Sequence, residues 1–148
     1  MAGLIAELEV SIPALRRFAN ALVRDPSEAD RLVRDCLVSA LDSLPSRRAE
    51  TDPRVWLFSI VHNLAGRRAG RPRPRGDADS GVLAALGELP LDQRSMLVLV
   101  AVEDLSYADA AQVVGVPVDA AMALLASARE TLRRAEADPA PATLRRVK

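Results

Sequence analysis

The stretch that decides the fold is Asp104–Arg134, DLSYADAAQVVGVPVDAAMALLASARETLRR. It predicts a short helix, a tight turn and a longer helix. Ser106 suits the N-cap position, because its hydroxyl oxygen can accept a backbone N–H of the first helical turn. Gly115 suits the left-handed residue that ends a helix, and Pro117 suits the start of the next one, where its missing N–H costs least. This order of elements is that of a helix-turn-helix.

The second helix of this motif has few groups that read DNA. Such helices read bases with basic, amide or hydroxyl side chains near their N-terminal end. Here residues 118–126 read VDAAMALLA, with one acid, Asp119, and no basic or amide residue. The nearest cation is Arg129, about three turns further along. We expect Met122 and Leu124 to be partly exposed, where they suit a protein partner better than DNA, or to pack on the N-terminal half.

The composition favours packed helices. Only 3% of the 148 residues are aromatic, while Ala, Leu and Val dominate, which makes a β-sandwich unfavourable. The only cysteine, Cys36, excludes an internal disulfide and is expected in the core. The only histidine, His62, has no second ligand at metal spacing. No apolar run approaches a membrane span and no basic segment precedes an apolar one at the N-terminus, so we expect a cytoplasmic protein.

The zero net charge hides a split between the two halves. Residues 1–75 hold 13 arginines against 9 acidic residues, whereas residues 76–148 hold 7 basic residues against 11 acidic ones. The first half can therefore approach a polyanion, and the second half is repelled by one. The most cationic run, Arg67–Arg75, either contacts phosphates or is a solvated linker.

Hydrophobic spacing and breaker residues predict an all-α fold. Ser27 is the expected N-cap of the second helix, after the Asp25–Pro26 break. The expected helices cover residues 12–23, 27–44, from 53 onwards, 82–87, 91–102 and the two of the helix-turn-helix. The expected domains are 1–75 and 82–137, with a linker at 76–81 and a flexible tail at 138–148.

Two sequence blocks, in this order, resemble a known family. Ala29–Asp35, ADRLVRD, is similar to the family pattern Ala-Glu-Asp-Leu-Val-Gln-Glu, and Trp56–Ala65, WLFSIVHNLA, to Trp-Leu-(aromatic)-x-Ile-x-Arg-Asn-Leu-Ala. Further on, Leu89–Arg94 (LPLDQR), Leu105–Ala111 (LSYADAA) and Gly115–Val118 (GVPV) fit a second family block. The chain thus resembles the extracytoplasmic-function (ECF) sigma factors, the smallest type of bacterial sigma-70 protein.

The resemblance implies region 2 of a sigma factor in the first block and region 4 in the second. It implies RNA polymerase core, promoter DNA and an anti-sigma factor as partners, with no cofactor, no metal and no enzymatic activity. The polymerase-binding residues that it implies are Leu32, Val33, Arg34 and Asp35. The DNA-binding residues that it implies are Trp56, His62, Asn63, Arg67, Arg68 and Arg71 in region 2 and, through phosphates more than bases, Ser106, Tyr107, Ser127, Arg129 and Arg133 in region 4.

Several of these roles have a structural alternative. Trp56 either stacks on an opened base or packs in the core. His62 is expected on the surface or against a phosphate, and Asn63 is either a base contact or a hydrogen-bonding helix residue.

The chain also departs from the family pattern. Arg31 replaces an acid in the polymerase-binding motif, His62 replaces an arginine, and the second helix of region 4 loses two arginines and gains Asp119. Two hypotheses follow: an ECF sigma factor, or a sigma mimic that keeps the surface for an anti-sigma factor and has lost its DNA contacts. The second resembles the sigma-like domain of partner-switching stress regulators.

Overall fold

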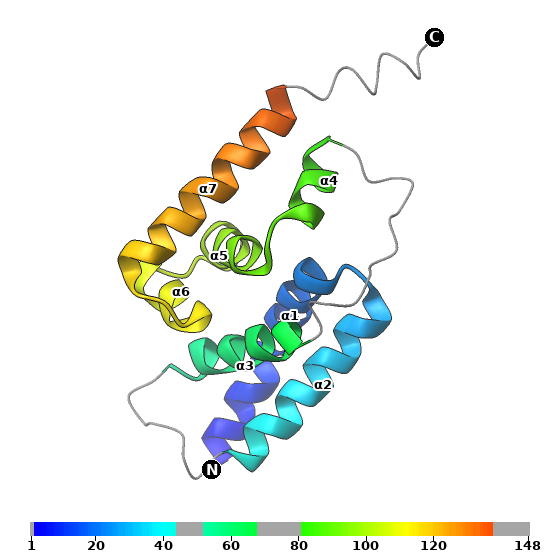
Figure 1. The fold of residues 1–148 in the computed structure, drawn as a ribbon. Coiled ribbons are helices and arrows are strands. Elements are labelled where there is room, and N and C mark those ends of the chain that lie inside the picture. The colour runs from blue at the N-terminus through cyan, green and yellow to red at the C-terminus, as the bar shows by residue number, and fades with distance from the viewer. Residues whose placement is uncertain (1, 44–51, 68–80, 138–148) are drawn as a thin grey trace.

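The computed structural model describes residues 2–43, 52–67 and 81–137, which form seven helices and no strand (Figure 1). The all-α prediction is therefore confirmed. Three helices make an N-terminal bundle: α1 (Ala2–Val23), α2 (Pro26–Asp42) and α3 (Pro53–Arg67). Four make a C-terminal bundle: α4 (Gly81–Glu88), α5 (Leu91–Ala101), α6 (Tyr107–Val114) and α7 (Val118–Ala137). The expected tail and, apart from Gly81, the expected linker lie outside the described residues.

Helix α1 begins ten residues before its predicted start. Pro13, one residue past the predicted start at Ile12, lies inside the helix. A proline within a helix removes one backbone hydrogen bond. The earlier turns are nevertheless helical, and Leu8 is buried in the core. Tertiary packing thus stabilises a segment whose local sequence argues against a helix.

The second and third helices begin at the same kind of Asp-Pro step. The carboxylate of Asp25 accepts the backbone N–H of Ser27 at 3.0 Å, and that of Asp52 accepts the N–H of Arg54 at 2.8 Å. The N-cap of α2 is therefore Asp25, and the prediction of Ser27 was wrong by two residues. A proline follows each cap, at a position where its fixed φ suits the helix.

The helix-turn-helix is confirmed in detail. The hydroxyl oxygen of Ser106 accepts the N–H of Asp109 at 3.0 Å. Gly115 is left-handed, with φ 84°, and its N–H donates to the carbonyl of Ala111 at 2.8 Å. Helices α6 and α7 are bent by 94° relative to one another. One face of α7 is buried through Ala121, Leu125 and Ala128.

The two bundles pack against one another, with α3 against α6 and α1 against α5 (Figure 1). One continuous set of buried residues runs through both. In the N-terminal bundle the rings of Phe18 and Phe58 meet edge to face, with centroids 5.1 Å apart. Cys36 is buried as predicted, and burial raises the pKa of its thiol to about 12.

None of the described helices, taken singly, has the length and apolarity needed to cross a membrane. Helices α6 and α7 meet that criterion only as a pair, across their bend.

Candidate nucleic-acid interface

Helix α3 has an outer face that carries three of the predicted DNA-binding residues. Trp56, Asn63 and Arg67 are separated by seven and four residues, which places them on one side of the helix. Asn63 and Arg67 are exposed, while Trp56 is half-buried against the core. The outer face thus combines an amide, a cation and a partly accessible aromatic ring, which suits contact with a nucleic acid backbone and with unstacked bases.

The opposite side of α3 is covered by the C-terminal bundle. Arg54, Phe58, His62 and Gly66 recur every four residues and form what we call the inner stripe. Arg54 contacts Glu103 and stacks over the ring of Phe58, 5.2 Å from its centroid. Arg54 and His62 of the inner stripe therefore serve the contact between the bundles, while Phe58 meets Phe18 of α1 and Gly66 is exposed.

His62 lies on this inner stripe, and its predicted place on the surface was wrong. It is 5% exposed. Its Nδ1 lies 2.9 Å from the hydroxyl of Ser95, and its Nε2 lies 3.2 Å from a carboxylate oxygen of Asp92. Because a carboxylate only accepts, these partners fit the neutral tautomer with its proton on Nε2. Burial lowers the pKa of His62 below 6.5, an effect that Asp92 partly offsets.

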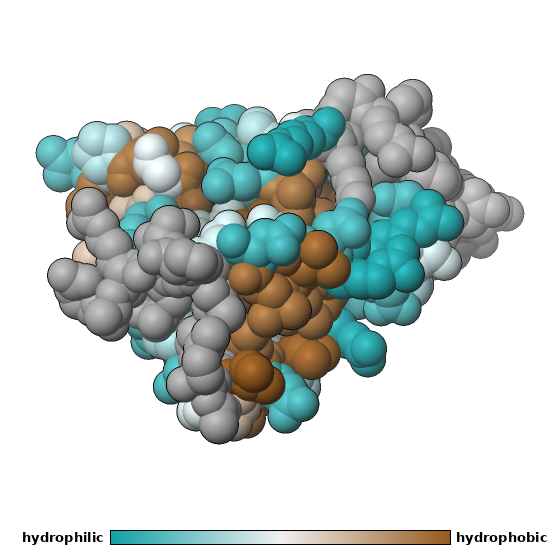
Figure 2. Space-filling model, turned by 90° about the horizontal axis from the view of Figure 1, so that it is seen from below, coloured by the Kyte–Doolittle hydropathy of each residue, from teal (hydrophilic) through white to brown (hydrophobic). Residues whose placement is uncertain are grey.

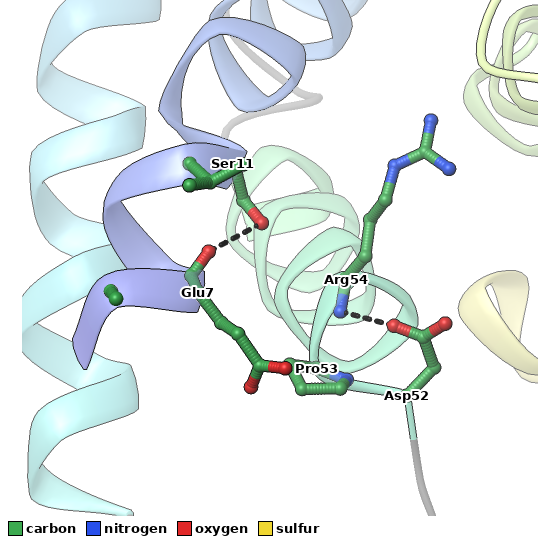
Figure 3. Close-up of a pocket in the computed structure, with 7 residues that line it drawn as sticks. Glu7, Ser11, Asp52, Pro53 and Arg54 are labelled. Atoms are coloured by element: carbon green, nitrogen blue, oxygen red, sulfur yellow. Dashed lines mark hydrogen bonds between the residues drawn. The ribbon is translucent and has the colours of Figure 1, made fainter. Parts of the chain in front are cut away.

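Arg54 connects the start of α3 with the C-terminal bundle. Its backbone N–H is held by Asp52, while its side chain extends away from that residue (Figure 3). The guanidinium donates to the carbonyl of Glu103 at 2.7 Å and contacts its carboxylate at 3.2 Å. A shallow groove of about 290 Å³ lies beside it, between α1 and the start of α3.

The predicted polymerase-binding residues of α2 divide between core and surface. Leu32 and Val33 are buried, so they stabilise the bundle and cannot contact a partner directly. Arg34 is exposed and Asp35 half-buried. The structure thus corrects the prediction for the two aliphatic residues, whose side chains point into the core.

The outer face of α2 contains two residues that sequence reasoning missed. Val38 is 54% exposed and Leu41 is 51% exposed. Together with Arg31 and Arg34 they follow a helical spacing of three and four residues, on the side away from the buried stripe. Leu41 follows the spacing of the apolar stripe and so was expected to be buried, whereas Val38 falls outside that stripe, which was the available signal. Figure 2 shows that hydrophobic residues also gather on the end of the molecule seen from below.

The predicted DNA-binding residues of the C-terminal bundle are exposed, but two of them already have partners within the bundle. The hydroxyl of Ser106 caps α6, and Tyr107 beside it is partly exposed. Arg133 pairs with Glu130, which also receives a hydrogen bond from Arg134 at 3.0 Å. The hydrogen bond from Arg133 is the main reason that the pKa of Glu130 is lowered.

Ser127 and Arg129 are exposed on α7, beyond its first turns. Closer to the N-terminus of that helix, Val118 is 40% exposed and Met122 is 47% exposed, whereas Leu124 packs against the core. The prediction of an exposed side chain is thus confirmed for Met122. The accessible face at the start of α7 is apolar, with one acid.

Arg68 and Arg71, both predicted to bind DNA, lie outside the described residues. Within those residues, no group of three or more His, Cys, Asp or Glu side chains could hold a metal ion.

Two family models match the chain, one for each bundle. Residues 8–62 match the sigma2 domain of PhyR, and residues 81–132 match sigma-70 region 4. The ECF RNA polymerase sigma factor EcfG of Rhodopseudomonas palustris is 33% identical over 147 residues, across 85% of this chain and 81% of the relative. The chain belongs to the ECF family of RNA polymerase sigma factors. Its activity is therefore that of a sigma factor, in promoter recognition and transcription initiation.

Other relatives agree with this family. The ECF sigma factor SigC of Mycobacterium tuberculosis is 31% identical, across 80% of this chain and 75% of SigC. Among solved structures, the sigma factor RpoE of Bartonella quintana, in complex with the anti-sigma factor NepR, has a TM-score of 0.75 at 26% identity, covering 91% of this chain and 97% of RpoE. CnrH, in complex with the cytosolic domain of CnrY, has a TM-score of 0.74 at 26% identity, covering 91% and 88%.

Proposed function

We propose that this ECF sigma factor uses two outer faces of its N-terminal bundle. The outer face of α2, with Arg34 and Asp35 of the original prediction beside Val38 and Leu41, binds RNA polymerase core. The outer face of α3, with Trp56, Asn63 and Arg67, contacts promoter DNA. The observation that carries this assignment is that both faces are accessible while the opposite face of α3 is covered.

The C-terminal bundle contributes to DNA binding through phosphates rather than bases. Ser127 and Arg129 are exposed on α7 beyond its first turns, whereas the start of that helix offers no basic side chain. A lone phosphate contact adds affinity that depends on salt but carries no sequence information. Promoter discrimination accordingly lies with the N-terminal bundle.

This role needs no catalysis by the chain itself, and it places the protein in the bacterial cytoplasm with polymerase. An anti-sigma factor is the proposed inhibitory partner, since RpoE, which shares this fold, was solved with the anti-sigma factor NepR. The two bundles act as domains with the bounds 1–75 and 82–137.

The test is capture of polymerase core followed by promoter-specific transcription in a purified system. Val38→Asp places a charge on the outer face of α2 and is expected to reduce core binding at least tenfold. Val118→Asp is the matched control, because it places the same charge at a similarly exposed valine of the C-terminal bundle. Equal loss in both variants, or no core binding by the native chain, would overturn the proposal.

One observation favours a second candidate, a sigma mimic that binds an anti-sigma factor. Residues 81–137 contain eight acidic residues and four arginines, and this net negative charge disfavours approach of the C-terminal bundle to the DNA backbone. The model that matches the first bundle describes PhyR, and a PhyR structure solved with NepR is that of an anti-anti-sigma factor. At 19% identity and a TM-score of 0.70, over 88% of this chain and 49% of that one, that likeness shows the fold alone.

A salt titration of DNA binding separates the two candidates. A sigma factor binds one sequence more tightly than others and loses affinity steeply as salt rises. A mimic binds no promoter at any salt concentration but binds the anti-sigma factor. The same titration on the complex with polymerase core shows whether region 2 reads DNA only in the holoenzyme.

A further inference from the structure

Four of the five buried polar or charged residues in the described part of the chain lie where the two bundles meet. They are His62, Arg94, Ser95 and Glu103, and the fifth is Ser11 of α1. A buried polar group is unfavourable unless it is paired. Polar contacts between domains are typical of interfaces that open and close, since their groups can return to water.

The first group of contacts, which we call the Glu103 cluster, fixes the loop between α5 and α6 to the N-terminal bundle. The carboxylate of Glu103 is fully buried. It accepts two hydrogen bonds from Arg17 of α1, at 2.9 and 3.1 Å, and contacts Arg54 of α3 at 3.2 Å. Within the described residues, both of its ion-pair partners thus come from the other bundle. The bond to Glu103 raises the pKa of Arg17.

The second group, the His62 cluster, lies two turns further along α3, about 12 Å from the level of Arg54. It consists of the contacts of His62 with Asp92 and Ser95 of α5. A third link is made by Arg94 of the same helix, which donates to the carbonyl of Leu22 at the end of α1.

The charges of the two halves explain why they close on one another. In each cluster the cation or imidazole belongs to the basic N-terminal half and the carboxylate to the acidic C-terminal half. Opposite charges from the two halves thus pair within the molecule at short distances, and one partner of each pair, Glu103 or His62, is buried.

We infer that the Glu103 and His62 clusters form a latch that closes the C-terminal bundle onto α3 without any partner protein. When the latch is closed, Arg54 and His62 are held against the C-terminal bundle and the outer face of α3 stays accessible. When it opens, the bundles separate. The inference holds for a sigma factor and for a sigma mimic alike, and its test uses neither polymerase nor DNA.

The test uses His62 as a reporter, because its ring signal in an NMR spectrum is that of the only histidine. In the native chain we expect an apparent pKa below 6.5, with Asp92 as the carboxylate that faces the ring. Glu103→Arg places a cation between Arg17 and Arg54. If the latch opens as a unit, this distant change raises the His62 pKa toward that of a solvent-exposed histidine and increases the radius of gyration in X-ray scattering.

Glu130 provides the matched control. It also pairs with two arginines, Arg133 and Arg134, but within the exposed face of α7. Glu130→Arg should leave both readouts unchanged. Combining Glu103→Arg with Arg17→Glu restores an opposite-charge pair and should return the His62 pKa toward its native value, which loss of folding would not allow.

Two results would overturn the latch. One is a native chain whose His62 already titrates at 6.5 with an expanded radius of gyration. The other is a Glu103→Arg protein with native helical content and an unchanged His62 pKa. Glu103→Gln, which keeps the size of the side chain and removes its charge, covers the case in which arginine unfolds the chain. It should shift the pKa in the same direction by less, and no shift in a folded Glu103→Gln protein would also reject the latch.

Discussion

The N-terminal and C-terminal bundles keep the helical framework of their sigma regions but differ in the chemistry of their exposed faces. Helix α3 presents Asn63 and Arg67 beside the half-buried Trp56, whereas the start of α7 presents Val118 and Met122. A DNA-binding surface needs cations and hydrogen-bond donors, and only the first face has them. The two bundles show that exposed contact residues can change while buried ones hold the fold.

The helix-turn-helix shows why the framework survives such changes. Ala121, Leu125 and Ala128 are buried on one side of α7, and Gly115 makes the turn. The residues that differ from the family pattern lie mostly on the other side, where alanine and leucine are strong helix formers. Replacing residues on that exposed side costs little in helix stability.

The largest effect is expected from a change that breaks the framework of the N-terminal bundle. Leu32 is completely buried in α2. Leu32→Ala should lower the free energy of unfolding by about 2–5 kcal/mol, because it removes apolar contacts and leaves a cavity. Urea denaturation followed by circular dichroism measures this loss.

The neighbouring surface residue of α2 supplies the control. Arg34→Ala should change stability by less than about 0.5 kcal/mol but weaken binding to polymerase core. If Leu32→Ala instead left stability unchanged and reduced core binding, Leu32 would be a contact residue as the sequence suggested.

The next effect concerns the turn of the C-terminal bundle. Gly115 has φ 84°, and a side chain built on it would meet no atom within 4 Å. Gly115→Ala should therefore cost about 1–2 kcal/mol through backbone strain alone. Thermal unfolding gives the value, and Gly115→Asn should be less destabilising, because asparagine tolerates this conformation. Equal losses for alanine and asparagine would mean that steric conflict, not backbone strain, governs the turn.

A smaller effect is expected on the salt dependence of DNA binding, which allows the two DNA-facing surfaces to be compared directly. Arg67→Gln on α3 should reduce the slope of log affinity against log salt by about 1, the value of one phosphate contact. That corresponds to roughly a threefold to fourfold change in affinity for a fourfold change in salt. Fluorescence anisotropy with promoter DNA and polymerase core measures the slope.

The reciprocal change should add a phosphate contact at the start of α7, the surface that lacks cations. Asp119→Arg on α7 replaces the one acid at the start of the helix and should raise the slope by about 1. A drop in affinity in this variant would show that Asp119 contacts DNA or positions a group that does, which contradicts the proposed division between the bundles.

Local motifs of the sequence predicted the elements more accurately than the partners of their side chains. Ser106 and Gly115 gave the ends of α6 correctly, because caps depend on neighbouring residues. The start of α1 was missed, since Pro13 argues locally against a helix that tertiary contacts stabilise. The sequence shows that a proline opposes the helix, but the outcome depends on the tertiary contacts of that helix, which the sequence does not give.

The candidate site was predicted only in part for the same reason. Asn63 and Arg67, both predicted to bind DNA, are exposed, but His62, one residue away from Asn63, is buried against α5. Adjacent helical residues differ by about 100° in direction. Which of them is covered depends on where the C-terminal bundle docks, and no motif within α3 specifies that.

The smallest effect is a gain rather than a loss of stability, and it concerns the contact between the bundles. Gly66 lies near the end of α3, and a Cβ placed on it would come 3.7 Å from a methyl group of Leu91 in α5, an ordinary packing distance. Gly66→Ala should stabilise the protein by about 0.5 kcal/mol, because alanine loses less backbone entropy in a helix. Urea unfolding compares it with native protein, and a gain that persists in the Glu103→Arg background would come from α3 itself. A gain that disappears there would come from the contact with Leu91, since that contact exists only while the two bundles are closed.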